Sequence, residues 1–143
     1  MNVIIKNLSE LESWVTSNLI LEIDNSCLIL LEGPLGAGKT QIVKSVAQIF
    51  GSAQIQSPTF SFHNQYKTNR GFTLHHVDLY RLKSEEDLES IGFWDLLHQE
   101  SGPFFIEWSN LLDFQVWPKN KKIIHIKIKK ENENVRSIDW TVS

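Results

Sequence analysis

Hydrophobic residues along this chain recur either at helical spacing or in the continuous and alternating runs of strands, and segments of these two kinds are interspersed. Ser9 is the expected N-cap of a first helix, because apolar positions at helical spacing follow it. Similar spacing fills 39–50 and 93–99, and Ser84 is a favourable N-cap for a further short helix. Continuous or alternating apolar runs, which are typical of strands, occupy 3–6, 26–32, 59–66, 72–78, 103–108, 121–130 and 135–142. This order predicts an α/β fold in which helices flank a mixed, partly parallel sheet.

Two pairs of the expected strands are close enough in sequence to form antiparallel hairpins. The runs 59–66 and 72–78 flank a polar segment that ends in Gly71. The run 121–130 alternates isoleucine with histidine and lysine, which is typical of a strand with one buried face, and 135–142 is its expected partner. These hairpins supply the antiparallel part of the predicted sheet.

A glycine-rich loop directly follows the apolar run 26–32. Its residues Gly33, Gly38, Lys39 and Thr40 fill the four required positions of G-x-x-x-x-G-K-[ST], the phosphate-binding P-loop. In such a loop the backbone N–H groups point at the β-phosphate, the lysine reaches the β- and γ-oxygens, and the hydroxyl is offered to Mg²⁺. Because a strand precedes the loop and a helical segment follows it, the sequence predicts a small P-loop NTPase domain.

Length, charge and composition indicate the number of domains and the class of protein. The length of 143 residues suits a single domain, 1–143, and the net charge of −3 argues against a surface that coats nucleic acid. The first residues lack the pattern of a signal peptide, and no apolar run is long enough to span a bilayer. We therefore expect a cytoplasmic protein that binds no membrane and is a monomer or associates only weakly with itself.

A P-loop hydrolase needs a second carboxylate near the loop, and the sequence offers two. Glu107 ends the buried stretch 104–107 within the run 103–108, and Asp78 ends the run 72–78. Ligands of open α/β folds bind at the carboxyl edge of the sheet, so both strands can end beside the loop. The pattern leaves open which of the two acids dominates metal binding, and it also allows that they share the site.

Other candidate residues keep two interpretations each. Thr59, in the segment after the helix 39–50, can present a hydroxyl to Mg²⁺ or water, or simply begin a strand. Arg81 can contact a phosphate or a partner, or form a structural ion pair with Asp78. Trp108 can cover the site or pack in the core. Since the chain lacks an Asn-Lys-x-Asp stretch for guanine, adenine is the favoured base.

Taken together, the motifs of this chain resemble those of one family. The shared motifs are Gly33–Thr40, Ser57-Pro58-Thr59-Phe60, His76-x-Asp78-x-Tyr80-Arg81-Leu82, Glu89-x-x-Gly92 and Ile106-Glu107-Trp108. In this order and spacing they resemble the TsaE family, also called YjeE, of small bacterial ATPases needed to make threonylcarbamoyladenosine in tRNA. The resemblance covers roughly residues 8–140, and it implies a small P-loop α/β fold with a mixed sheet.

The resemblance also implies roles for individual residues. It implies ATP contacts by Leu35, Gly36, Ala37, Gly38, Lys39, Thr40, Gln41, Trp108 and Arg136. It implies that Thr40 and Glu107 hold Mg²⁺. It implies catalytic or switch roles near the γ-phosphate for Lys39, Asp78, Glu107 and Thr59.

Several positions depart from the family's usual pattern. Pro34 replaces an acid, Gln41 replaces a threonine, and Ser109-Asn110 replaces a frequent Pro-Glu. Near the last strand, where the family often has Gly-Arg, this chain keeps only Arg136 of the pair. These departures put the anchoring of the loop and the hydroxyl at position 41 in question, but they remove no expected phosphate or metal ligand.

The expected activity is weak ATP hydrolysis, a hydrolase function that partners stimulate. By resemblance the partners are TsaB-like and TsaD-like proteins, which modify adenosine 37 of tRNAs that read ANN codons, and tRNA contact is indirect. A basic cluster from Lys119 to Lys130 is more typical of a solvated face than of a tRNA footprint. Two rival functions are an ATP-dependent binding or switch module whose hydrolysis is incidental, and a small-molecule kinase.

Overall fold

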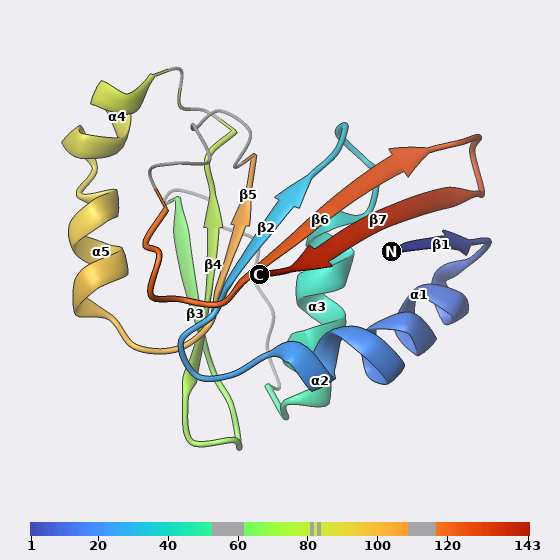
Figure 1. Ribbon diagram of the computed structural model, residues 1–143, viewed down its shortest axis with the longest axis horizontal. Helices are drawn as coiled ribbons and strands as arrows, with labels where there is room; N and C mark the ends of the chain where they lie inside the picture. The colour runs from blue at the N-terminus through green and yellow to red at the C-terminus, as the bar shows by residue number, and fades with distance from the viewer. Residues whose placement is uncertain (53–61, 81, 83, 109–116) are drawn as a thin grey trace.

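The computed structural model describes residues 1–52, 62–80, 82, 84–108 and 117–143. Within these residues, seven strands form one mixed sheet in the order β1-β7-β6-β2-β5-β4-β3 (Figure 1). The strands are β1 (Asn2–Ile5), β2 (Leu28–Glu32), β3 (His63–Lys67), β4 (Thr73–Asp78), β5 (Phe104–Glu107), β6 (Ile123–Lys130) and β7 (Arg136–Val142). The predicted α/β fold with a mixed, partly parallel sheet is confirmed.

Strand directions divide the sheet into a parallel centre and antiparallel margins. β2 pairs in parallel with β5 and β6, and β4 pairs in parallel with β5. The predicted hairpins are confirmed in the described residues, because β3 pairs antiparallel with β4 and β6 pairs antiparallel with β7. β1 adds an antiparallel edge strand beside β7. The carboxyl ends of the four parallel strands therefore meet at one edge of the sheet, where the 33–40 loop begins.

Helical segments lie on both faces of the sheet. They are α1 (Leu8–Trp14), the π-helical turn η1 (Val15–Leu19), α2 (Ile20–Glu22), α3 (Lys39–Ile49), α4 (Glu85–Ser90) and α5 (Phe93–Gln99). The helices expected at 39–50 and 93–99 and the N-cap at Ser84 are confirmed. The N-cap expected at Ser9 is wrong: Asn7 caps α1, because its extended backbone lets Oδ1 accept a hydrogen bond from the N–H of Glu10 at 2.8 Å.

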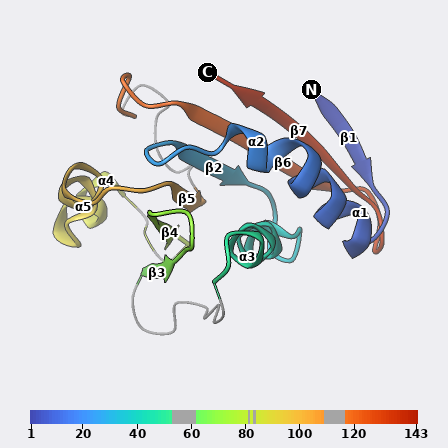
Figure 2. The ribbon, with the colours of Figure 1, turned by 90° about the horizontal axis from the view of Figure 1, so that it is seen from below.

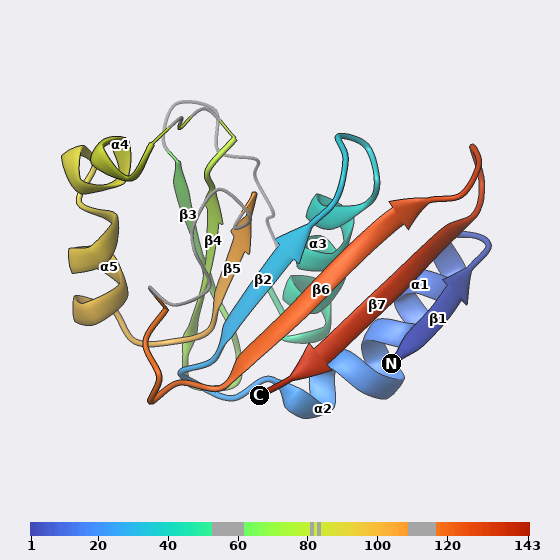
Figure 3. The ribbon, with the colours of Figure 1, turned by 45° about the horizontal axis from the view of Figure 1, so that its top comes forward.

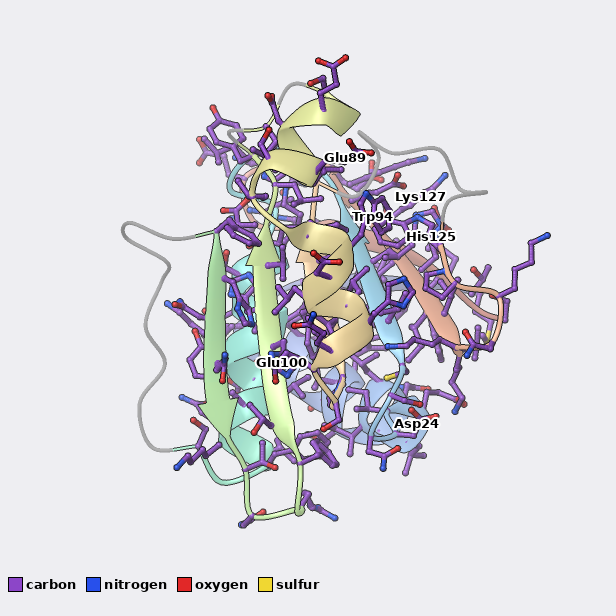
Figure 4. All side chains as sticks on the ribbon, turned by 90° about the vertical axis from the view of Figure 1, so that its left-hand side faces the viewer. Asp24, Glu89, Trp94, Glu100, His125 and Lys127 are labelled. Carbon is purple, nitrogen blue, oxygen red and sulfur yellow. The ribbon has the colours of Figure 1, made fainter. Side chains whose placement is uncertain are left out.

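Two apolar cores, one on each face, hold the helices to the sheet. One core joins α1, η1 and α3 to residues such as Ile29, Phe105 and Ile126, and the other joins α4 and α5 to residues such as Leu30 and Phe104. Figures 2 and 3 show α1, α2 and α3 on one side of the β2–β6–β7 region. Figure 4 looks onto α4 and α5, with His125 and Lys127 of β6 visible beyond them. β2 is buried on both faces, as its continuous apolar sequence predicts.

Among the described residues, none of the helices has both the length and the apolar composition needed to cross a bilayer.

The backbone of Gly102, just before β5, lies very close to the backbone of β4. It precedes β5 with φ of +113°, and a Cβ atom added there would lie 1.9 Å from the carbonyl oxygen of Thr73. The next residue, Pro103, accepts a 2.9 Å hydrogen bond from the N–H of His75, so β4 and β5 begin side by side. A side chain at 102 would push these two strands apart.

We predict that Gly102→Ala destabilises the protein more than Gly71→Ala. Gly71 has a similar left-handed φ of +85° but no neighbouring atom within 4 Å of an added Cβ. Gly71→Ala should therefore cost about 1 kcal/mol for backbone strain alone, and Gly102→Ala about 3 kcal/mol or more. Urea unfolding of the two variants measures the difference. Equal losses of unfolding free energy would contradict the close approach.

Candidate functional site

The site is built around the loop that links β2 to α3. At Gly33 the loop passes so close to β6 that an added Cβ would lie 2.7 Å from the carbonyl oxygen of Ile128. Gly36 and Gly38 have left-handed φ angles of +79° and +118°, which ordinary side chains disfavour. The chain therefore curls over the N-terminal end of α3, where backbone N–H groups lack partners inside the helix.

Lys39, the first residue of α3, is held inside this loop. Its side chain is only 5% exposed, its Nζ donates a hydrogen bond to the Gly33 carbonyl oxygen, and it lies 3.6 Å from the centre of the Trp108 ring. Burial lowers the pKa of Lys39, and the carboxylates of Glu107 and Asp78 oppose that shift. The ammonium group is therefore poorly solvated, and an anionic ligand would suit it as a partner.

Glu107 ends β5 on the α3 side of the sheet and is 4% exposed. The hydroxyl of Thr40 donates to its carboxylate, at 3.1 Å from Oε1 and 3.3 Å from Oε2. Nε2 of His76 lies 2.6 Å from the same Oε2. The strand-end glutamate and the threonine of the loop, 67 residues apart in sequence, are thus brought into direct contact.

Asp78 lies beside Glu107, because the two residues are paired in the parallel register of β4 and β5. Its Oδ1 accepts a 2.9 Å hydrogen bond from the backbone N–H of Tyr80. Burial raises the pKa of Asp78 and the nearby Glu107 raises it further, while the bond from Tyr80 acts in the opposite direction. Glu107, not Asp78, is the acid that contacts Thr40 among the described residues.

Most of the predicted site residues line one cavity. Its walls are formed by Leu35, Gly36, Gly38, Lys39, Thr40, Asp78, Tyr80, Glu107 and Trp108. Trp108 has a left-handed φ of +65°, unusual for a bulky residue, and its ring centre lies 5.1 Å from that of Tyr80. Trp108 therefore covers Lys39 from the β5 side and also packs against the α5-side core, so both interpretations of this residue describe part of its environment.

A second, largely apolar cavity adjoins the other side of the loop. It is lined by Ile5, Asn7, Leu8, Leu11, Gly36, Ala37, Gly38, Gln41, Ile128, Asn134, Arg136 and Ile138. Ala37, Gln41 and Arg136, which were expected at the site, lie here, and Gly36 and Gly38 border both cavities. Sequence reasoning missed the contribution of β1 and α1, because no motif marks residues such as Leu8 and Leu11.

The guanidinium group of Arg136 contacts the backbone of the loop. Its Nε donates a 3.1 Å hydrogen bond to the carbonyl oxygen of Ala37, and an Nη atom donates to Asn132 and Glu133 carbonyl oxygens. The guanidinium group thus fastens the loop to the β6–β7 turn. The remaining predicted residues Thr59, Arg81 and Asn110 lie outside the described residues.

Comparison with known proteins connects this arrangement to one family. A family model described as threonylcarbamoyl adenosine biosynthesis protein TsaE matches residues 6–138. The chain belongs to the TsaE family. TsaE proteins take part in the biosynthesis of threonylcarbamoyladenosine in tRNA.

Individual TsaE proteins and one solved structure agree with the assignment. The TsaE protein of Rickettsia felis is 37% identical over 111 residues, which cover 76% of this chain and 61% of that protein. The Bacillus subtilis TsaE protein is 35% identical over 116 residues, or 80% of this chain and 68% of that one. The crystal structure of Bacillus subtilis YdiB shares the fold, with a TM-score of 0.70 and 24% identity over 100% of this chain and 84% of that chain. The match spans about three fifths of the Rickettsia felis relative's length.

We predict that Asp78→Asn stabilises the ligand-free protein. Because folding raises the pKa of Asp78, its charged form opposes folding above that pKa and its protonated form favours folding at lower pH. Asparagine removes the charge and keeps an oxygen for the Tyr80 N–H, so the melting temperature at pH 7 should rise by about 2 °C. The gain should shrink as the pH falls toward 4. A lower melting temperature at pH 7 would contradict the assigned cost of this charge.

Proposed function

We propose that this chain is a P-loop ATPase that binds ATP with Mg²⁺, hydrolyses it slowly, and thereby supports threonylcarbamoyladenosine formation in tRNA. The observation that carries the proposal is the contact of the Thr40 hydroxyl with the Glu107 carboxylate behind a loop of the P-loop pattern. A hydroxyl and a carboxylate oxygen are ligands that suit Mg²⁺. Lys39 lines the same cavity as Thr40 and Glu107, so a cation that can bind phosphate lies beside the proposed metal ligands.

In this proposal Lys39 exchanges partners when ATP binds. Its Nζ leaves the Gly33 carbonyl and bonds the β- and γ-phosphate oxygens, while the N–H groups of the loop and of the first turn of α3 contact the phosphates. Thr40 and Glu107 would hold Mg²⁺, and the ion would supply neutralisation of negative charge on the phosphate oxygens. The Trp108 ring stays over the phosphate site and limits access of bulk water.

Asp78 is the proposed acceptor for the proton of the attacking water. It lines the same cavity as Lys39 and Glu107, and its raised pKa makes it a better base than an ordinary surface aspartate. Arg136 acts at a distance from the phosphates by keeping the loop carbonyl groups turned toward β7.

The adjoining apolar cavity is the proposed site for adenine and ribose. It shares Gly36 and Gly38 with the phosphate cavity, so a nucleotide can pass from one to the other along the loop. Ile5, Leu8, Leu11 and Ile138 offer the apolar surface that a base requires.

The cavity itself suggests that hydrolysis is slow without partners. Of the described residues that line the phosphate cavity, Lys39 alone is a cation. Phosphoryl transfer is commonly accelerated by a second cation that stabilises the transition state. We propose that TsaB-like and TsaD-like partners complete the site, and that tRNA is reached through that complex. The same observation favours, as a second candidate, a binding module switched by ATP whose hydrolysis is incidental.

We predict that Lys39→Ala and Glu107→Gln each reduce Mg²⁺-dependent ATP hydrolysis by about 100-fold or more. The first removes a cation that stabilises the transition state, and the second removes a carboxylate ligand of the metal ion that does so. Lys127→Ala is the matched control, because Lys127 is 56% exposed and lies outside the cavity. Phosphate release is measured for the chain alone and then with TsaB-like and TsaD-like proteins and tRNA added in turn. Hydrolysis that ignores every addition would contradict the proposed partner role.

The variant Glu107→Gln also separates the two candidate functions. If hydrolysis drives the biological role, a strain that carries only this variant should lose threonylcarbamoyladenosine from its tRNA. If the chain is a switch module, the variant should still bind ATP and its partners, and the modification should persist.

For the base cavity we predict that Leu8→Asp weakens ATP binding by about 10-fold, because the carboxylate replaces apolar contact and repels the anionic ligand. Binding of inorganic tripolyphosphate, which lacks a base, should weaken by a smaller factor. Leu21→Asp is the control, since Leu21 is exposed and does not line the cavity. Calorimetric titration of both ligands measures the effect. Equal loss for the two ligands would place the base elsewhere.

A further inference from the structure

His76 is a buried histidine that the proposed chemistry does not use. It lies on β4 next to β5 and is 2% exposed, and its Nε2 is 2.6 Å from Oε2 of Glu107. Because side chains alternate along a strand, His76 and Asp78 face the α3 side of the sheet, while His75 faces the α5 side. The histidine therefore lies directly behind the carboxylate proposed to hold Mg²⁺.

The hydrogen bonds of Glu107 show what His76 adds. Thr40 reaches both carboxylate oxygens at similar distances, 3.1 and 3.3 Å, so it does not by itself fix which oxygen faces the cavity. His76 contacts Oε2 alone, at a shorter distance. With a donor on Oε2, the free lone pairs of Oε1 are directed to the loop. Thr40 and His76 are the side chains that bond Glu107 among the described residues.

We propose that His76 is a positioning residue: its Nε2–H holds Oε2 of Glu107 so that Oε1 faces the hydroxyl of Thr40 and the cation site between them. The inference rests on the proposed function, because it assigns Glu107 to Mg²⁺. With the Thr40 hydroxyl engaged as a metal ligand, His76 would be the remaining described side chain that restrains the Glu107 carboxylate. Residues that orient metal ligands in this way commonly change metal affinity by about 10- to 100-fold when they are replaced.

A purely structural role is the alternative explanation for a buried histidine, and His75 provides the matched control. His75 is also fully buried on β4, but its ring stacks on Phe104. Its two ring nitrogens contact Nε2 of His63 and the carbonyl oxygen of Ser101. Replacing His75 removes a buried imidazole from the same strand without touching Glu107. Any effect on Mg²⁺ that exceeds the effect of His75→Leu therefore belongs to the contact with Glu107.

The experiment compares His76→Leu, which fills the space without a donor, with His76→Gln, whose amide N–H can replace Nε2–H. ATP affinity is measured by calorimetry as a function of Mg²⁺ concentration, and urea unfolding of the ligand-free proteins monitors folding. We expect His76→Leu to raise the Mg²⁺ concentration for half-maximal enhancement of ATP binding by about 10-fold or more. ATP affinity without Mg²⁺ should stay unchanged, and His76→Gln should restore the Mg²⁺ dependence to within about 3-fold.

Each of three outcomes would overturn the inference. They are an equal shift of the Mg²⁺ requirement in His76→Leu and His75→Leu, a folded His76→Gln variant that behaves like His76→Leu, and an ATP affinity that falls as much without Mg²⁺ as with it. Glu107→Gln separates this inference from the proposed function. If that variant leaves the Mg²⁺ requirement unchanged, the metal role of Glu107 fails; if it raises the requirement and His76→Leu does not, only the role of His76 fails.

Discussion

The parallel pairing of β2 with β5 is the constraint on which the rest of the site depends. Leu31, one residue before the end of β2, is in register with Glu107 at the end of β5, so the loop that leaves β2 begins beside the carboxylate. Side chains alternate between the two faces of a strand, so a slip of one residue would turn Glu107 toward α5 and away from Thr40. The register of β4 with β5 places Asp78 beside Glu107. The register of β2 with β6 brings Gly33 close to the carbonyl oxygen of Ile128.

The same arrangement gathers charges that are costly to bury. Lys39 and Glu107 are each at most 5% exposed, and Asp78 is only partly exposed beside them. In the ligand-free protein each charge has a local partner: the Gly33 carbonyl and the Trp108 ring for Lys39, and Thr40 with His76 for Glu107. Polar partners of this kind reduce the desolvation cost of a buried charge without removing it. The site is therefore less stable than an apolar packing of the same volume, as is common for functional sites.

Sequence reasoning succeeded where the signal is local. The periodicity of 39–50 and 93–99 marked α3 and α5, and the alternation in 121–130 marked β6 with its antiparallel partner. The proximity of Glu107 to Thr40 was also predictable, because an acid at the end of a buried parallel strand lies at the same sheet edge as a loop of this type.

What the sequence left undetermined depends on contacts between distant segments. Whether Glu107 or Asp78 contacts Thr40 is set by the strand order and the tilt of side chains at the sheet edge. The cap of α1 lies at Asn7 and not at Ser9, because the extended backbone of Asn7 places its Oδ1 within hydrogen-bond distance of the Glu10 N–H. The apolar cavity combines Leu8 and Leu11 with Ile138, and no sequence pattern joins residues so far apart. The contact of His76 with Glu107 likewise follows from strand pairing alone.

The central claim is that Thr40 and Glu107 form the metal side of an ATP site whose loop binds the phosphates. A crystal structure of the chain with a non-hydrolysable ATP analogue and Mg²⁺ tests it most directly. We expect phosphates enclosed by residues 35–40 and the Nζ of Lys39 moved from the Gly33 carbonyl to phosphate oxygens. We also expect Mg²⁺ about 2.1 Å from the Thr40 hydroxyl, with Glu107 bonded to it directly or through water. A nucleotide bound outside this loop, or a metal ion with neither Thr40 nor Glu107 near it, would contradict the account.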